Sequence, residues 1–388
     1  MRAAEETKLA GGERPRKVAK SDFAPTAKPH LESLRPYSPG KPAAEVEREL
    51  GLTDVLKLAS NENALGMSPL ARAALESALE DSSIYPDTHC RQLVDEIARR
   101  NGLGPECVMF GNGAVELIYY LAQCFLAAGD EVVTSGTSFS AYTIASRIQD
   151  AVVRAAPLDG AGLDLGAMSR LVNEHTKLVF IANPNNPTGT ILGVDELEAF
   201  ARTLPEQVVL VLDEAYYDFV DDPRYRGSVS FVLEGWNVVV LRSLSKSLGL
   251  AGLRIGYAMA RSDIIRTMRQ VQVPFHVNVL AQRAALAGLD DDEHIARTLQ
   301  LIREGKEYLY AALAAAGLQF TASETNFIWV DTGVDAARLF DEMMRGGVIV
   351  RPGTGFGAPR HIRVTIGLPE QNRRFMQVLL ASITRVKP

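Results

Sequence analysis

The sequence predicts an α/β protein with a mostly parallel central sheet in a large domain and a smaller α/β domain at its C-terminal end. Three observations support this prediction: continuous apolar runs that alternate with amphipathic stretches, polar clusters directly after three of these runs, and a change of pattern after Gln282. Continuous apolar runs are typical of parallel strands that helices cover on both faces.

The predicted strands of the large domain are its apolar runs. They occupy residues 131–134, 178–182, 208–212 and 237–241. Polar residues follow three of them, at 183–189, 213–216 and 242–246. Because ligands of open α/β sheets bind beyond the carboxyl ends of the strands, we expect these three clusters to meet in one crevice.

The C-terminal region has a different pattern. A long helical pattern covers residues 294–315, and a predicted strand follows at 326–330. A helix near 336–345 and strands at 347–351 and 362–366 come next. Helices and strands interleaved over about a hundred residues indicate a second, smaller α/β domain.

Composition excludes several classes of protein. The 388 residues are 47% hydrophobic, which is enough for a large core. A net charge of -6 argues against nucleic-acid or membrane partners. The cysteines, Cys90, Cys107 and Cys124, are scattered, so neither a disulfide framework nor a metal site is indicated. The apolar runs are too short to span a bilayer, and we expect a cytoplasmic protein.

A lysine lies in the third polar cluster. Residues 243–257 read Ser-Leu-Ser-Lys-Ser-Leu-Gly-Leu-Ala-Gly-Leu-Arg-Ile-Gly-Tyr. A lysine amine that forms a Schiff base must be deprotonated part of the time, and burial beside cations lowers its pKa toward that state. Ser243, Ser245 and Arg254 offer donors to a phosphate. A surface lysine in a Ser/Gly-rich loop is the ordinary alternative for Lys246.

Residues 243–257 resemble the lysine-bearing signature of the fold-type I aminotransferases that use pyridoxal 5'-phosphate (PLP). In that signature a lysine follows two small hydroxyl residues and an arginine comes eight positions later, which matches Lys246 and Arg254. The resemblance implies a fold-type I PLP transferase in which Lys246 attaches the cofactor and is the catalytic residue. It also implies that Ser243, Ser245 and Arg254 bind the cofactor phosphate.

The other two polar clusters match the same family. By the resemblance, Asp213 pairs with the pyridine nitrogen of the cofactor and keeps it protonated. Tyr216 and Asn186 resemble the pair that hydrogen-bonds the phenolic oxygen of the ring. Taken singly, these residues also fit a helix cap, a core aromatic side chain and a turn. The order of the matched landmarks argues against those alternatives.

Two further family positions lie upstream. Gly113, Ala114 and Val115 open a helical pattern, and backbone amides at a helix start can bind the cofactor phosphate. Phe139 stands where the family stacks an aromatic ring on the cofactor, whereas Tyr142 fits that role less well. Both aromatic side chains also fit a position in the core.

The resemblance covers the chain from about residue 34 onward and is closest to the histidinol-phosphate aminotransferases. The segments that carry it are residues 34–40, 58–63, 85–87, 183–189, 274–278 and 350–353. It implies a homodimer with active sites at the interface, in which Tyr85 reaches the cofactor phosphate of the partner. It also implies that Tyr37 and Asn61 bind the substrate. Arg351 and Arg363 would receive its anionic group.

The resemblance divides the chain into four predicted parts. Residues 1–33 contain no apolar stretch of signal-peptide length and are not acid-poor like a transit peptide, and we expect them to form a flexible tail. Residues 34–59 form an N-terminal arm that packs on the small domain or on the dimer partner. Residues 60–280 form the large PLP-binding domain, and residues 281–388 form the small C-terminal domain.

Several positions depart from the family pattern near the expected substrate. The family's glycine-rich stretch is absent around His89 and Cys90, and Val115 stands where the family has an acidic or amide residue. Leu248 replaces an aromatic residue, and His276 replaces an asparagine. Surface or interface histidines with no catalytic role are the ordinary interpretation of His89 and His276.

The predicted reaction transfers an amino group from histidinol phosphate, or a related amino acid, to a 2-oxo acid.

Three alternatives stay open at this stage. One is an aromatic amino acid aminotransferase. Another is a specialised PLP enzyme that carries out elimination, cyclisation or decarboxylation on the same scaffold. The third is a non-catalytic PLP-fold protein, against which the complete set of cofactor residues argues.

Overall fold

The computed structural model describes residues 26–36 and 40–387. Tyr37 and most of the predicted N-terminal tail lie outside these residues. Within the described part of the chain, no helix combines the length and apolar character needed to cross a membrane.

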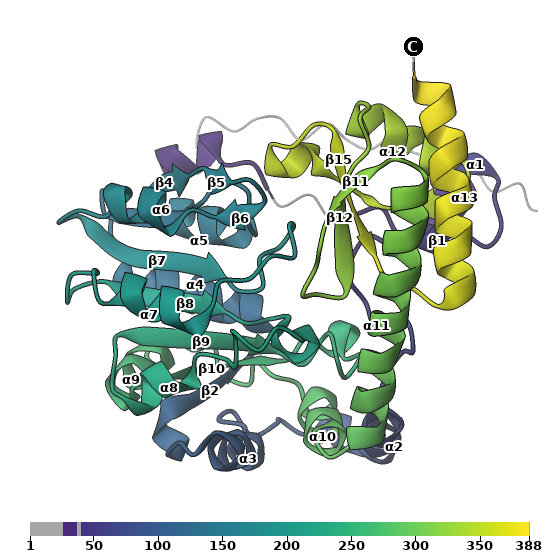
Figure 1. The fold of residues 1–388 in the computed structure, drawn as a ribbon. Helices are drawn as coiled ribbons and strands as arrows, with labels where there is room; N and C mark the ends of the chain where they lie inside the picture. Colours follow the sequence, from purple (N-terminus) through teal and green to yellow (C-terminus); the bar gives the residue numbers. More distant parts are fainter. Residues whose placement is uncertain (1–25, 37–39, 388) are drawn as a thin grey trace, which may run out of the picture.

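A seven-stranded sheet forms the centre of the large domain (Figure 1). Its order is β2 (Val108–Gly111), β10 (Gly256–Ala260), β9 (Val238–Ser243), β8 (Val209–Asp213), β7 (Thr176–Ala182), β3 (Glu131–Ser135) and β4 (Val152–Ala156). β10 is antiparallel to both of its neighbours, and the other strand pairs are parallel. The predicted mostly parallel α/β fold is therefore confirmed.

Helices cover both faces of this sheet, which explains why its strands are continuously apolar. One face packs on α4 (Ala114–Phe125), α5 (Ala141–Ile148) and α9 (Ser262–Arg269). The other face packs on α3 (Arg91–Asn101), α6 (Leu165–Leu171), α7 (Val194–Ala201), α8 (Val229–Leu233) and α10 (Val279–Gly288). Successive residues of β8 enter opposite cores: Leu210 packs in one and Val211 in the other.

An antiparallel four-stranded sheet forms the small domain. Its order is β11 (Gln319–Thr321), β12 (Phe327–Asp331), β15 (His361–Thr365) and β14 (Arg351–Pro352). It shares a core with α11 (Asp292–Ala315), α12 (Ala336–Arg345) and α13 (Pro369–Val386). In Figure 1, the long helix α11 runs from the region of α10 beside the large domain to the small domain.

The predicted strand at 347–351 is two short strands that belong to different sheets. β13 (Val348–Ile349) pairs in parallel with β1 (Leu56–Lys57), whereas β14 pairs with β15. The run of residues hides this change of partner, because both halves are extended backbone and only their burial differs: β13 is buried and β14 is half-buried. The change places Arg351 directly opposite Arg363.

The N-terminal segments pack on both domains. α1 (Ala43–Leu50) and β1 lie against the small domain, where Val46 and Val55 share a core with Ile349. The 3-10 turn η1 (Pro29–Ser33) lies near α5, and His30 Nε2 is 3.1 Å from the carbonyl oxygen of Ile148. α2 (Pro69–Ser77) packs on α10 and is followed by η2 (Leu79–Ser83).

The remaining elements are short connections. They are the hairpin β5 (Leu158–Asp159) and β6 (Gly162–Leu163), and the turns η3 (Pro105–Cys107), η4 (Tyr217–Phe219), η5 (Ala251–Leu253) and η6 (Gly353–Phe356). Three of these turns lie at the cavity of the candidate site: Tyr216 precedes η4, Arg254 follows η5, and η6 contains Phe356.

Candidate active site

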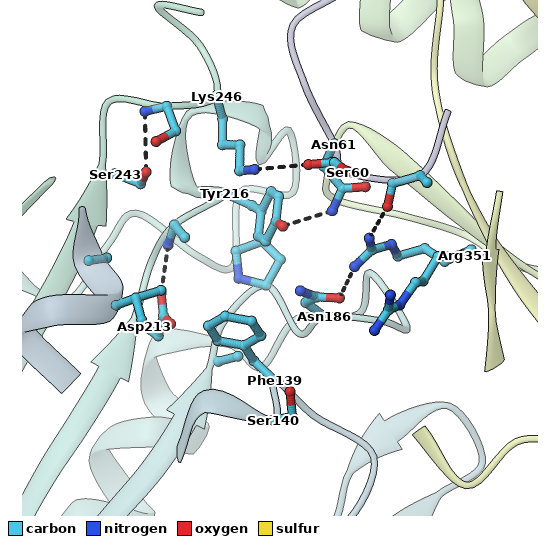
Figure 2. Close-up of a pocket in the computed structure, with 18 of the residues that line it drawn as sticks. Ser60, Asn61, Phe139, Ser140, Asn186, Asp213, Tyr216, Ser243, Lys246 and Arg351 are labelled. Atoms are coloured by element: carbon cyan, nitrogen blue, oxygen red, sulfur yellow. Dashed lines mark hydrogen bonds between the residues drawn. The ribbon is translucent and has the colours of Figure 1, made fainter. Parts of the chain in front are cut away.

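A cavity of about 1080 Å³, including its open mouth, lies beyond the carboxyl ends of β7, β8 and β9 (Figure 2). The three polar clusters meet there, as the strand pattern predicts. Of the residues selected from the sequence, the following line the cavity: Asn61, Ala114, Val115, Phe139, Asn186, Asp213, Tyr216, Ser243, Ser245, Lys246, Arg254, Arg351 and Arg363.

Lys246 enters the cavity from the loop after β9. Its Nζ donates to the carbonyl oxygen of Ser60 at 3.3 Å and lies 5.7 Å from the centre of the Tyr216 ring. Burial, together with the positive charges of Arg363 and Arg254, lowers the pKa of Lys246 to about 8. A partly buried amine with this pKa is suited to nucleophilic attack and to proton transfer near neutral pH.

Asp213 ends β8 on the floor of the cavity and is 6% exposed. Its Oδ1 accepts from the backbone N–H of Ala215 at 3.1 Å, and its Oδ2 accepts from the hydroxyl of Tyr142 at 2.7 Å. Burial raises the pKa of this carboxyl, and the Tyr142 hydrogen bond opposes that rise. An ionised carboxylate here would suit a cationic ring nitrogen.

The hydrogen bond between Tyr142 and Asp213 was not predicted from the sequence. There, Tyr142 was only a less suitable candidate than Phe139 for stacking on the cofactor. The two rings meet edge to face, with centroids 5.7 Å apart. Phe139 and Ser140 line the cavity, and Tyr142 lines it from the first turn of α5. The sequence carries no local signal for the hydrogen bond to Asp213, because the two residues lie 71 positions apart.

Two amide side chains connect the large and small domains at the cavity. Asn61 Nδ2 donates to the Tyr216 hydroxyl at 2.8 Å, and the Asn61 N–H donates to Thr365 of β15. Asn186 Oδ1 accepts from Arg363 Nη1 at 2.5 Å. The small domain thus reaches both the Tyr216 and the Asn186 side of the cavity.

Arg351 and Arg363 occupy the small-domain wall of the cavity. They stand directly opposite each other on β14 and β15, so their side chains share one face of the sheet. Arg363 is buried, donates to the Ala59 carbonyl oxygen at 2.6 Å and lies 5.2 Å from the Phe327 ring. Two guanidinium groups on one wall suit a substrate with a carboxylate or a phosphate.

The opposite end of the cavity suits a phosphate. α4 begins there at Ala114, and Arg254 adopts a left-handed conformation that leaves its Nη1 donating to Ala251 at 2.9 Å. Gly113 has a φ of 79°, which favours glycine, and a Cβ there would lie 2.4 Å from Arg254 Nη2 and displace the end of that side chain. Ser243 Oγ accepts from the N–H of Ser245 at 3.2 Å.

Other selected residues lie away from the cavity. Tyr85 is 79% exposed and stacks on Phe275, with centroids 4.5 Å apart. His276 is a buried structural histidine whose Nε2 is 3.0 Å from the Phe110 carbonyl oxygen. His89 is exposed, and burial raises the pKa of Cys90 to about 12. None of these four line the cavity with Lys246.

Comparison with known proteins identifies the family. Residues 53–379 match the family model described as aminotransferase class I and II. The chain belongs to this family. It is 43% identical to the histidinol-phosphate aminotransferase of Moorella thermoacetica over 92% of both chains, and 44% identical to histidinol-phosphate aminotransferase 2 of Carboxydothermus hydrogenoformans over 90% of this chain and 97% of that one.

Solved structures agree with this assignment. The aminotransferase superposes on the histidinol-phosphate aminotransferase of Sinorhizobium meliloti, solved in complex with pyridoxal-5'-phosphate, with a TM-score of 0.86. The two are 27% identical over 93% of this chain and 98% of the other. Aspartate aminotransferase of Thermus thermophilus, 24% identical, shares the fold with a TM-score of 0.79 over 94% of this chain and all of that one.

Proposed function

We propose that this aminotransferase binds PLP through Lys246 and transfers an amino group from histidinol phosphate, or a related amino acid, to a 2-oxo acid. The observation that carries the proposal is that Lys246, Asp213 and Arg254 face one cavity. Family membership supports the reaction type, and the names of the relatives at 43% and 44% identity support the donor.

The residues of the cavity fit each group of the cofactor. Asp213 would hold the pyridine nitrogen, Tyr216 and Asn186 the phenolic oxygen, and Phe139 one face of the ring. The phosphate would lie at the start of α4, among donors that line the cavity: Ala114, Val115, Ser243, Ser245 and Arg254. Gly113, the proposed sixth donor, precedes Ala114 as the N-cap of α4 and does not itself line the cavity.

When bound, PLP supplies an electron-accepting ring that stabilises negative charge on the substrate carbon. Lys246 is then both anchor and general base. With its pKa lowered to about 8, the Nζ released by the substrate is neutral often enough to take the α-proton and return it. The Ser60 carbonyl oxygen, 3.3 Å from Nζ, holds this amine inside the cavity.

Histidinol phosphate has a phosphate and no carboxylate, and Arg351 and Arg363 are suited to bind that phosphate in this proposal. Two adjacent arginines offer more N–H donors than a single carboxylate can accept from, whereas a phosphate has a third oxygen to accept them. Asn61 would complete the substrate side of the pocket. Tyr37, outside the described residues, stays a proposed substrate contact.

We further propose a homodimer that presents Tyr85 to the partner's cofactor phosphate. Several large apolar side chains are exposed on one region of the surface, and Tyr85 stacks on one of them, Phe275. This apolar patch consists of Ile84, Tyr85 and Phe275. Such a patch marks an interface more often than open surface.

The proposed parts of the chain remain the arm at 34–59, the large domain at 60–280 and the small domain at 281–388. The proposed location is the cytoplasm, which the free thiols of Cys90, Cys107 and Cys124 support.

Cofactor attachment is tested with Lys246→Ala. The wild-type protein mixed with PLP should acquire the visible absorbance of a lysine-bound cofactor, and the variant should not. Lys306→Ala is the matched control, because Lys306 is also buried with a lowered pKa but lies on α11 outside the cavity. Unchanged absorbance in Lys246→Ala would contradict the proposed attachment.

The reaction is tested by supplying histidinol phosphate, phenylalanine or arginine together with a 2-oxo acid. Mass spectrometry of both products should show one amino acid formed from the acceptor for each donor consumed. A donor product that forms without a matching amino acid would reject transamination. Preference for phenylalanine would replace the proposed donor by an aromatic amino acid.

A further inference from the structure

The protein itself holds both oxygens of the Asp213 carboxylate. Ala215 N–H donates to Oδ1 at 3.1 Å, and the Tyr142 hydroxyl donates to Oδ2 at 2.7 Å. The Ala215 contact is local, two residues along the chain. The Tyr142 contact joins residues 71 positions apart and fixes the carboxylate from α5.

Tyr142 is itself fixed by aromatic packing. Its side chain is 1% exposed, and its ring stacks on Phe180 of β7 with centroids 4.8 Å apart and planes at 7°. Phe139 meets it edge to face. A ring packed in this way holds its hydroxyl in place, so Asp213 Oδ2 is held without a further loss of side-chain freedom on ligand binding.

The electrostatics at this position oppose ionisation of Asp213. Burial and the neighbouring charge of Glu214 raise its pKa, whereas the Tyr142 hydrogen bond and the charge of Lys246 lower it. Burial and Asp213 raise the pKa of Tyr142 well above its usual value, with Tyr216 adding to the rise. Tyr142 therefore remains a hydrogen-bond donor throughout the range in which Asp213 titrates.

We propose that Tyr142 is a positioning residue that keeps Asp213 ionised and aims its carboxylate at the pyridine nitrogen of the cofactor. This inference rests on the proposed function, in which Asp213 binds that nitrogen. It assigns to Tyr142 a task distinct from ring stacking. Phe139 remains as the aromatic side chain for the ring face.

Tyr142→Phe tests the inference because it keeps the packed ring and removes only the hydroxyl. The dissociation constant for PLP, measured by equilibrium dialysis of the cofactor-free protein, should rise by about tenfold or more, as for a lost hydrogen bond to a charged group. Affinity requires ionised Asp213, whose pKa the substitution raises. As the pH is lowered, PLP affinity should therefore decline at a higher pH in the variant than in the wild type.

Tyr120→Phe is the matched control. Tyr120 is also buried, on α4, and its hydroxyl accepts from the Val273 N–H at 3.1 Å, away from the cavity. It should leave PLP affinity and its pH profile unchanged. Thermal unfolding of both variants shows whether either has lost its fold.

A double-mutant cycle with Asp213→Asn separates positioning from general packing. If Tyr142 acts through the Asp213 carboxylate, Tyr142→Phe should cost much less PLP affinity in the Asp213→Asn protein than in the wild type. Equal costs in both backgrounds, or a wild-type dissociation constant and pH profile for Tyr142→Phe, would overturn the inference. Wild-type protein that does not bind PLP would instead refute the proposed function.

Discussion

At the scale of single residues, the cavity combines groups whose ordinary chemistry is altered by burial. Lys246 is partly buried in the cavity that Arg254 and Arg363 also line, and its pKa falls to about 8. Asp213 is buried beside it, and its pKa rises. Both shifts bring the pKa of the group closer to physiological pH, so that its neutral form is more populated there. Hydrogen-bond donors to the Asp213 carboxylate oppose this shift and favour the ionised form.

The lowered pKa of Lys246 predicts selective reactivity in the cofactor-free protein. A small amine-acylating reagent should label Lys246 half-maximally near pH 8, because the neutral amine is the nucleophile and becomes the majority species above its pKa. Peptide mass spectrometry across a pH series measures this. Exposed lysines should follow their ordinary pKa near 10.4. A Lys246 curve that coincides with theirs would refute the lowered pKa.

Glycine at position 113 is favoured by its positive φ, and any larger residue would also contact the end of the Arg254 side chain. Gly113→Ala should weaken PLP binding by about tenfold or more, because the added Cβ would lie 2.4 Å from Arg254 Nη2 and displace a phosphate donor. Gly129→Ala is the control: Gly129 also has a positive φ, but a Cβ there has no heavy atom within 4 Å.

Both alanine variants should lose about 1–2 kcal/mol of unfolding free energy, the cost of a left-handed conformation. Only Gly113→Ala should change the PLP dissociation constant. Equal PLP affinity in the two variants would show that Arg254 is not held against the start of α4 for phosphate binding.

At the scale of secondary-structure elements, short strands place the two arginines that line one wall of the cavity. β14 has two residues, yet its pairing with β15 sets Arg351 opposite Arg363. The turn from β13 to β14 changes sheets between Ile349 and Arg351. The arginine pair therefore depends on a strand exchange that the apolar pattern does not reveal.

Arg363→Lys tests the role of this strand pair. Lysine keeps the positive charge but loses the planar fork, so kcat/KM with histidinol phosphate should fall by about tenfold to a hundredfold. Steady-state kinetics provide the measurement. Arg360→Lys is the control, since Arg360 forms an exposed ion pair with Asp331 at 3.0 Å nearby on the small domain. An unaffected kcat/KM in Arg363→Lys would remove Arg363 from the proposed phosphate site.

At the scale of the whole molecule, the cavity forms where the two domains meet. The large domain contributes the strand ends that carry Asn186, Asp213 and Lys246, and the small domain contributes Arg351 and Arg363. Asn61, between the N-terminal arm and the large domain, contacts Tyr216 on one side and Thr365 on the other. Movement of one domain would therefore change both walls of the site.

The apolar patch around Tyr85 predicts self-association through one face. Ile84→Asp should convert a dimer into a monomer and weaken PLP binding, because it places a charge on a side chain that is 68% exposed in the single chain and would be buried in the dimer. Analytical ultracentrifugation gives the mass in solution. Leu233→Asp, at a leucine 58% exposed on α8, should remain dimeric.

An Ile84→Asp protein that keeps the mass of the wild-type dimer would exclude this patch from the interface. A wild-type protein that is monomeric at all concentrations measured would refute the proposed homodimer and the trans role of Tyr85.

Much of the fold and of the cofactor site was predictable because each part is local in the chain. An apolar run followed directly by Asp213 or Lys246 specifies both a buried strand and the residue at its end. The predicted runs at 178–182 and 208–212 correspond closely to β7 and β8. The clusters then meet because parallel neighbouring strands present their carboxyl ends at one edge.

The sequence by itself therefore determined which groups meet at the strand ends: a lysine, a carboxylate and a set of donors suited to a phosphate, all in one crevice. Only the tertiary structure decided how these groups are held, through Tyr142 with Asp213 and Asn186 with Arg363, pairs that are 71 and 177 positions apart. The physical reason is that strand patterns depend on neighbours in the chain. A hydrogen bond between distant residues depends on packing of whole elements, which no local pattern encodes.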